Sequence, residues 1–116
     1  MLLTMVSEMN KTVWILGTRY RIIEEEFADK DIDGYCDYTS KEIHLRNDNA
    51  NGVGDFESMM RKQTRHEIIH AFMSESGLQA NWEHFRGFGH DETTVDWFAI
   101  QFPKIQKAFE EVGCLQ

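Results

Sequence analysis

The sequence has few of the residues that mark several common classes of protein. Its 116 residues include one proline and two cysteines, and it has twelve Lys and Arg residues compared with twenty Asp and Glu. The net charge of −8, without any basic cluster, argues against direct nucleic-acid binding, because phosphate backbones are held by grouped Lys and Arg. Binding to anionic membrane surfaces is disfavoured for the same reason.

Long apolar runs and closely spaced cysteines are also missing. No run approaches the length that spans a membrane, and residues 1–6 lack the basic start of a signal peptide. Cys36 and Cys114 have no metal-type spacing, and two isolated cysteines are typical of free thiols in a reducing cytoplasm, although a disulfide between them stays open. We therefore expect a cytoplasmic protein without a membrane anchor.

The composition, 41% apolar and 28% charged, predicts one folded domain at residues 12–116 after a loosely ordered leader at residues 1–11. Four segments have the β-branched, aromatic and alternating side chains of strands. They are residues 12–16, 19–23, 34–38 and 42–46. The last two are separated by a short polar turn, which predicts a hairpin.

Residues 29–34 match the opening of a calcium-binding loop. Asp29, Asp31 and Asp33 stand at its first, third and fifth positions, and Gly34 stands at the sixth. Ser40 occupies the twelfth position, where a bidentate glutamate is needed, and the flanking segments are predicted strands rather than helices. A polar turn is the favoured interpretation, with calcium binding as the alternative.

Residues 55–76 are predicted to form a long helix. Asp55 is a suitable N-cap, Glu57 lies favourably in the first turn, and Gly77 can end the helix. The apolar side chains of this segment give it a broad buried surface. Histidines buried on such a helix would be costly without a partner such as a metal, whereas a single core histidine is usually neutral and hydrogen-bonded.

The motif His-Glu-x-x-His lies in the middle of this helix. Residues four apart share one helix face, so His66 and His70 can bind one metal ion together. Glu67 projects about 100° further round the helix, where a general base for a metal-bound water belongs. The motif is short, and its context decides its meaning.

Residues 92–102 predict a second helix, and Glu92 and Asp96 share one of its faces. Its expected buried positions are Val95, Phe98, Ala99 and Phe102. Pro103 is expected to end this helix and to begin a short C-terminal helix at residues 104–111.

The order of these motifs resembles the gluzincin arrangement of zinc peptidases, in which a second helix brings a glutamate as third ligand. The run Glu-Thr-Thr-Val-Asp-Trp-Phe-Ala at residues 92–99, before a proline, resembles more narrowly the ImmA/IrrE-type metallopeptidase domain, many members of which occur in phages and mobile elements. The likeness covers roughly residues 12–103. Val95 stands where alanine is usual, and the chain has no room for the DNA-binding module that often accompanies this domain.

The resemblance implies that His66, His70 and Glu92 bind one Zn²⁺ per chain. It makes Glu67 the general base and acid, and Asp96 the partner that orients a ligand imidazole. Two imidazoles and a carboxylate also suit zinc on chemical grounds, and zinc lowers the pKa of its bound water towards neutrality.

His90 and His84 are the alternative third ligands. His90 precedes the second helix by two residues and could instead donate a hydrogen bond to an oxyanion, whereas His84 is the weaker candidate. The metzincin pattern is excluded, because it needs glycine and histidine where this chain has Met73 and Ser76.

The expected fold is α+β, with a small antiparallel sheet of about three strands packed against two active-site helices and a short C-terminal helix. The expected function is a zinc-dependent endopeptidase that binds a protein or peptide substrate as an added strand along the hairpin edge, with residues 77–91 roofing the cleft. A repressor-like regulator, in a bacterial or phage-infected cell, is one candidate substrate. The alternative is a phage-like metal-binding interaction module without catalytic activity.

Overall fold

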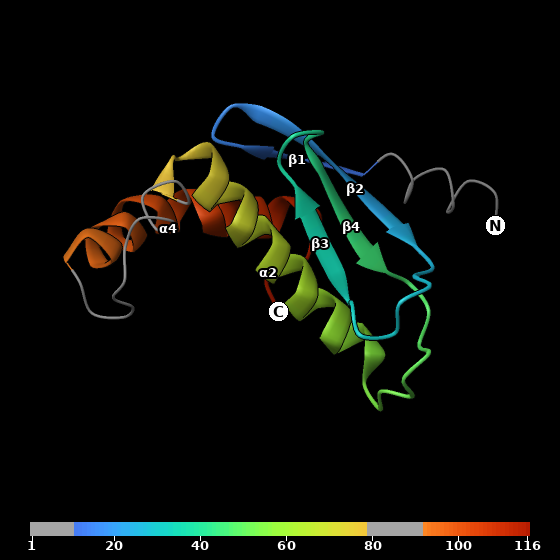
Figure 1. The fold of residues 1–116 in the computed structure, drawn as a ribbon. Coiled ribbons are helices and arrows are strands. Elements are labelled where there is room, and N and C mark those ends of the chain that lie inside the picture. Colours follow the sequence, from blue (N-terminus) through green and yellow to red (C-terminus); the bar gives the residue numbers. More distant parts are fainter. Residues whose placement is uncertain (1–10, 79–91) are drawn as a thin grey trace.

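The computed structural model describes residues 11–78 and 92–116 (Figure 1). The strands are β1 (Thr12–Ile15), β2 (Thr18–Glu25), β3 (Gly34–Asp37) and β4 (Glu42–Arg46), and the helices are α2 (Phe56–Glu75) and α4 (Glu92–Val112). The predicted α+β class, a small sheet packed against helices, is confirmed. The expected leader lies outside the described residues apart from Lys11, as does the expected roof of the cleft apart from Gly77 and Leu78.

The sheet has four strands in the order β1-β2-β4-β3. Both local pairs, β1 with β2 and β3 with β4, are antiparallel, but β2 and β4 are parallel neighbours. The sheet is therefore mixed, whereas an antiparallel sheet of about three strands was expected. Glu24 near the end of β2 and Gly34 at the start of β3 both lie opposite Leu45 of β4. β3 therefore runs back antiparallel to β2, and β4 lies between them, parallel to β2. β3 is left as an edge strand.

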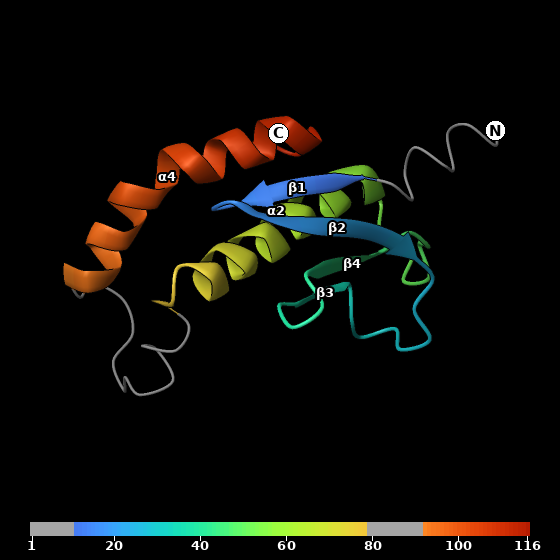
Figure 2. The same ribbon diagram turned by 90° about the horizontal axis from the view of Figure 1, so that it is seen from above.

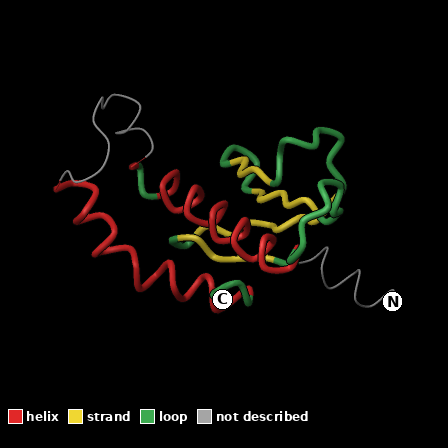
Figure 3. Tube along the Cα trace, turned by 90° about the horizontal axis from the view of Figure 1, so that it is seen from below, coloured by secondary structure: helices red, strands yellow, loops and turns green. Residues whose placement is uncertain are grey.

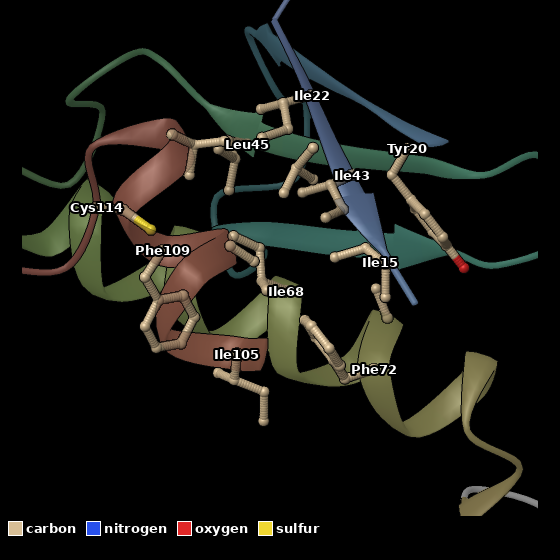
Figure 4. Close-up of a cluster of buried hydrophobic side chains, with 14 of the residues drawn as sticks. Ile15, Tyr20, Ile22, Ile43, Leu45, Ile68, Phe72, Ile105, Phe109 and Cys114 are labelled. Atoms are coloured by element: carbon tan, nitrogen blue, oxygen red, sulfur yellow. The ribbon is translucent and has the colours of Figure 1, made fainter. Parts of the chain in front are cut away.

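Alternation along the strands places one set of side chains under the helices. Tyr20 and Ile22 of β2 and Ile43 and Leu45 of β4 are buried, and they meet apolar side chains of both helices (Figure 4). The two helices thus cover the same face of the sheet (Figure 2). In the described part of the chain, no helix has both the length and the apolar character that a membrane crossing requires.

Helix α2 begins and ends where the sequence predicts. The Asp55 carboxylate accepts a hydrogen bond from the Ser58 backbone N–H at 3.1 Å, which satisfies one free donor of the first turn. Gly77 follows the last turn with a φ of 83°, a conformation that glycine adopts without strain. These two signals fix the ends of the helix that carries the histidines.

Helix α4 differs from the prediction. Pro103 lies inside it, so the expected separate helix at residues 104–111 is wrong. Proline removes one backbone hydrogen bond, and α4 bends near its middle instead of ending (Figure 2). Phe98 and Phe102 were expected to be buried but are 39% and 55% exposed, because the first half of α4 extends past the sheet; Trp97 is buried instead.

The loop between β2 and β3 is organised by a buried arginine. The Arg46 guanidinium donates to the carbonyl oxygens of Ile32, at 3.1 Å, and Asp29, and it pairs with the Asp48 carboxylate at 2.7 Å. The Asp29 carboxylate accepts the backbone N–H of Asp31 at 2.9 Å, as in an Asx turn. The segment that matched a calcium loop is therefore a polar turn that contains a guanidinium of the chain itself.

Candidate metal centre

His66 and His70 lie one turn apart on α2 with their rings facing each other. Their Nε2 atoms are 3.2 Å apart, and the ring planes meet at 72°. Two nitrogens bound to one tetrahedral zinc ion at ordinary bond lengths would be about 3.3 Å apart. The pair therefore fits two ligand positions of one zinc ion, and without a metal one Nε2–H can donate to the other nitrogen.

Both imidazoles are exposed, so the expectation that burial would force a metal partner on them is wrong. Glu67 is the buried member of the motif, with 3% of its surface exposed. Burial raises the pKa of its carboxyl group, and this effect outweighs the hydrogen bond from Gln63 and the nearby His66 and His70, which lower it. A carboxylate in such surroundings is suited to accept and return a proton.

A groove of about 530 Å³ runs between α2 and the edge strand β3. Residues 31–36 and Tyr38 line its strand side. Its helix side is lined by Gln63, His66, Glu67, His70 and Ser74. The two metal-ligand candidates and the candidate base thus face the same space, next to a strand edge that pairs with no other described strand.

Glu92 is the first residue of α4, and Asp96 follows one turn later, but their side chains are not among those the structure describes. In this half of α4, the indole of Trp97 donates to the hydroxyl of Ser76 at 2.8 Å. Ser76 caps the end of α2, more than a turn beyond His70. Figures 1 and 3 show the first half of α4 projecting past that end, so this arrangement brings the histidines and Glu67 together without placing the start of α4 beside them.

Among the side chains described in residues 11–78 and 92–116, no three His, Cys, Asp or Glu gather into a metal site. His84 and His90, the alternative ligands, lie outside the described residues. The described part of the site therefore offers two candidate ligand positions and a candidate base.

Three residues of the groove were not assigned to the site of the histidines from the sequence. Gln63 donates to Glu67 Oε2 at 2.5 Å, and its position four residues before Glu67 could have predicted this contact. Asp31 reaches the groove only through the path of the loop before β3, which no local pattern specifies. Cys36 is a free thiol whose pKa is raised to about 12, first by burial and then by the nearby carboxylates of Glu67 and Asp37.

Comparisons of the chain with models of known protein families, with curated proteins and with solved structures yield no match. The resemblance to ImmA/IrrE-type metallopeptidases therefore depends on the sequence motifs and stays a prediction.

Proposed function

We propose that this chain is a zinc-dependent endopeptidase in which His66 and His70 bind the metal and Glu67 is the general base. One observation carries the proposal: two exposed imidazole nitrogens 3.2 Å apart and a buried carboxylate line one groove beside an unpaired strand edge. This combination contains a metal-binding pair, a proton acceptor and a surface for an extended peptide.

Zinc bound there would lower the pKa of a bound water and polarise the carbonyl of the peptide bond. Glu67 would take up at Oε1 the proton that the water loses as its oxygen bonds to the carbonyl carbon, and would deliver this proton to the amine that leaves when the C–N bond breaks. Within the described residues Oε1 has no hydrogen-bond partner, whereas Oε2 accepts the Gln63 amide. Gln63 thereby holds the carboxylate group in one orientation through Oε2 and leaves Oε1 available.

The substrate is expected to lie extended along β3. In the described sheet β3 pairs only with β4, so its other edge is free to form backbone hydrogen bonds with an added strand. From the family resemblance we further propose a cytoplasmic location in a bacterial or phage-infected cell, and a repressor-like protein as one substrate.

Glu92 is proposed as the third ligand and Asp96 as the partner of a ligand imidazole, again from the resemblance. For Glu92 to reach the histidines, the first half of α4 has to move towards α2, and the bend at Pro103 is a suitable pivot. Replacing Glu92 by Ala should weaken zinc affinity by about ten-fold or more, measured by competition with a chelator. Unchanged affinity in Glu92→Ala, with a loss in His90→Ala, would transfer the ligand role to His90.

A second function, a metal-binding interaction module without catalysis, is favoured by a different observation. Phe98, Ile100 and Phe102 on α4 are 39%, 64% and 55% exposed, and exposed apolar side chains of this size often mark a binding surface. In such a protein zinc would stabilise the fold, and Glu67 would have no chemical task.

The two functions are separated by Glu67→Gln. For a peptidase, this variant keeps about one zinc per chain but loses hydrolysis of a peptide library, whereas His70→Ala loses both. Glu57→Gln, an exposed acid on the first turn of the same helix, is the matched control and should keep both properties. If wild-type protein loaded with one zinc cleaves no peptide and unfolds when zinc is removed, the protein is an interaction module and the peptidase proposal is refuted.

A further inference from the structure

The groove beside the histidines is lined by three acidic side chains and by no Lys or Arg of the part of the chain that the structure describes. The three acids are Asp31, Asp33 and Glu67. Glu67 is buried next to the histidines, and the two aspartates lie at the end of the groove formed by the loop before β3.

The two aspartates are incompletely neutralised. Asp31 is exposed, and its carboxylate pairs with no described residue. Asp33 is 3.8 Å from the Arg46 guanidinium, but that group makes a closer pair with Asp48 at 2.7 Å. Residues 29–33 with Arg46 and Asp48 contain four aspartates, one lysine and one arginine, so the loop that carries Asp31 and Asp33 has a net charge of −2 together with its arginine and Asp48.

These carboxylates are held at a defined distance from the candidate base. Gly34 packs so closely on Gln63 that an added Cβ would lie 3.2 Å from its Cγ, so the start of β3 lies one helical turn before Glu67. A strand rises about 3.3 Å per residue. A side chain two or three positions from the cleaved bond of a peptide lying along β3 would therefore reach Asp31 or Asp33.

The same end of the groove offers apolar surface. Ile32, between the two aspartates in the sequence, is 41% exposed and belongs to the lining. Lysine and arginine have an apolar stem and a charged end, and they bind best where apolar surface leads to a carboxylate. Arg46 fixes the loop from inside, so the carboxylates need little reordering when a ligand binds.

From this placement we infer that the groove selects peptide segments with a lysine or arginine two or three positions from the cleaved bond, and that Asp31 and Asp33 provide the selectivity. The position relative to a cleaved bond rests on the proposed function, whereas the preference for a cationic segment rests on the lining alone.

The test uses three extended peptides that differ only in having lysine, glutamine or glutamate at those positions. Binding is measured by fluorescence anisotropy with zinc-loaded Glu67→Gln protein, and cleavage with the wild type. We expect the lysine peptide to bind about three- to ten-fold more tightly than the glutamine peptide at low salt, and high salt to reduce the difference. Introducing Asp31→Asn, or Asp33→Asn as a second variant, into the same protein should reduce this difference in affinity. Glu57→Gln should leave the difference unchanged.

Equal binding of the lysine and glutamine peptides, or a lysine preference that survives both aspartate substitutions in folded protein, would overturn the inference. Circular dichroism and thermal melting show whether each variant is folded. A lysine preference in binding without cleavage by the wild type would support the groove assignment and refute the peptidase. Cleavage of all three peptides at equal rates would refute the selectivity and support the peptidase.

Discussion

Replacing Arg46 by Met should destabilise the protein and loosen the loop that carries Asp31. The guanidinium is 1% exposed, and the substitution keeps the apolar stem while removing every donor. Two backbone carbonyls and the Asp48 carboxylate then lose their partner, and the contact of the guanidinium with the Phe27 ring, 5.4 Å from its centroid, is lost as well.

Water can replace part of this loss, because the Asp48 side chain is 27% exposed and Asp48 still accepts the backbone N–H groups of Phe27 and Ala50. We therefore expect about 1 kcal/mol for each of the hydrogen bonds to Ile32 and Asp48 and somewhat less for the ring contact, or about 2.5 kcal/mol in total. For a chain of this length that corresponds to a fall of about 10 °C in Tm.

Urea unfolding and thermal melting measure the change. Arg21→Met is the matched control, because Arg21 is 61% exposed, pairs with Glu42 on the outer face of the sheet, and should cost at most about 0.5 kcal/mol. If the two variants differ by less than about 1 kcal/mol, Arg46 does not organise the loop as described. Calcium should leave the melting of the wild type unchanged; a clear rise in Tm would restore the calcium-loop alternative.

Three further predictions concern the groove and its surroundings. Gln63→Ala should lower peptide hydrolysis by about ten-fold while zinc content stays near wild type, because the hydrogen bond that orients Glu67 and lowers its pKa is lost. The thiol of Cys36, with a pKa of about 12, should react slowly with Ellman's reagent at pH 8 until the protein unfolds. Hydrogen bonds from Thr39, then Ser40, lower the pKa of Asp37 to about 2, so their contribution to stability is present above pH 4 and is lost as the pH falls towards 2. Carbon NMR titration should report this pKa, and Thr39→Ala should move it back towards its usual value.

Local signals in the sequence predicted the parts of the fold that neighbouring residues determine. Asp55 marks the start of α2 and Gly77 marks its end, because an N-cap and a residue with positive φ each affect only the adjacent turn of the helix. The histidine pair is equally local, because the i, i+4 spacing alone places the two imidazoles on one face of the helix. The hairpin of β3 with β4 was predicted from a short polar turn and alternating side chains.

Contacts between distant segments could not be predicted in this way. Nothing in the two hairpins indicates that β2 and β4 pair in parallel, because that pairing depends on the path of residues 26–33. Pro103 was expected to end a helix. The helix instead continues through it with a bend, because the following turn packs on the core through Ile105 and Phe109. Phe98 and Phe102 have helical spacing, yet whether that face is buried depends on which element lies opposite.

The candidate site combines both kinds of information. His66, Glu67 and His70 are placed by one helix, so their geometry holds wherever α4 lies. A ligand from α4 is placed by tertiary packing, and the described contact of its first half, Trp97 with Ser76, lies at the end of α2 rather than beside the histidines. Two imidazoles bind zinc more weakly than two imidazoles and a carboxylate, because catalytic zinc sites use three protein ligands. The difference in zinc affinity between wild type and Glu92→Ala therefore reports directly whether the two helices meet around the metal.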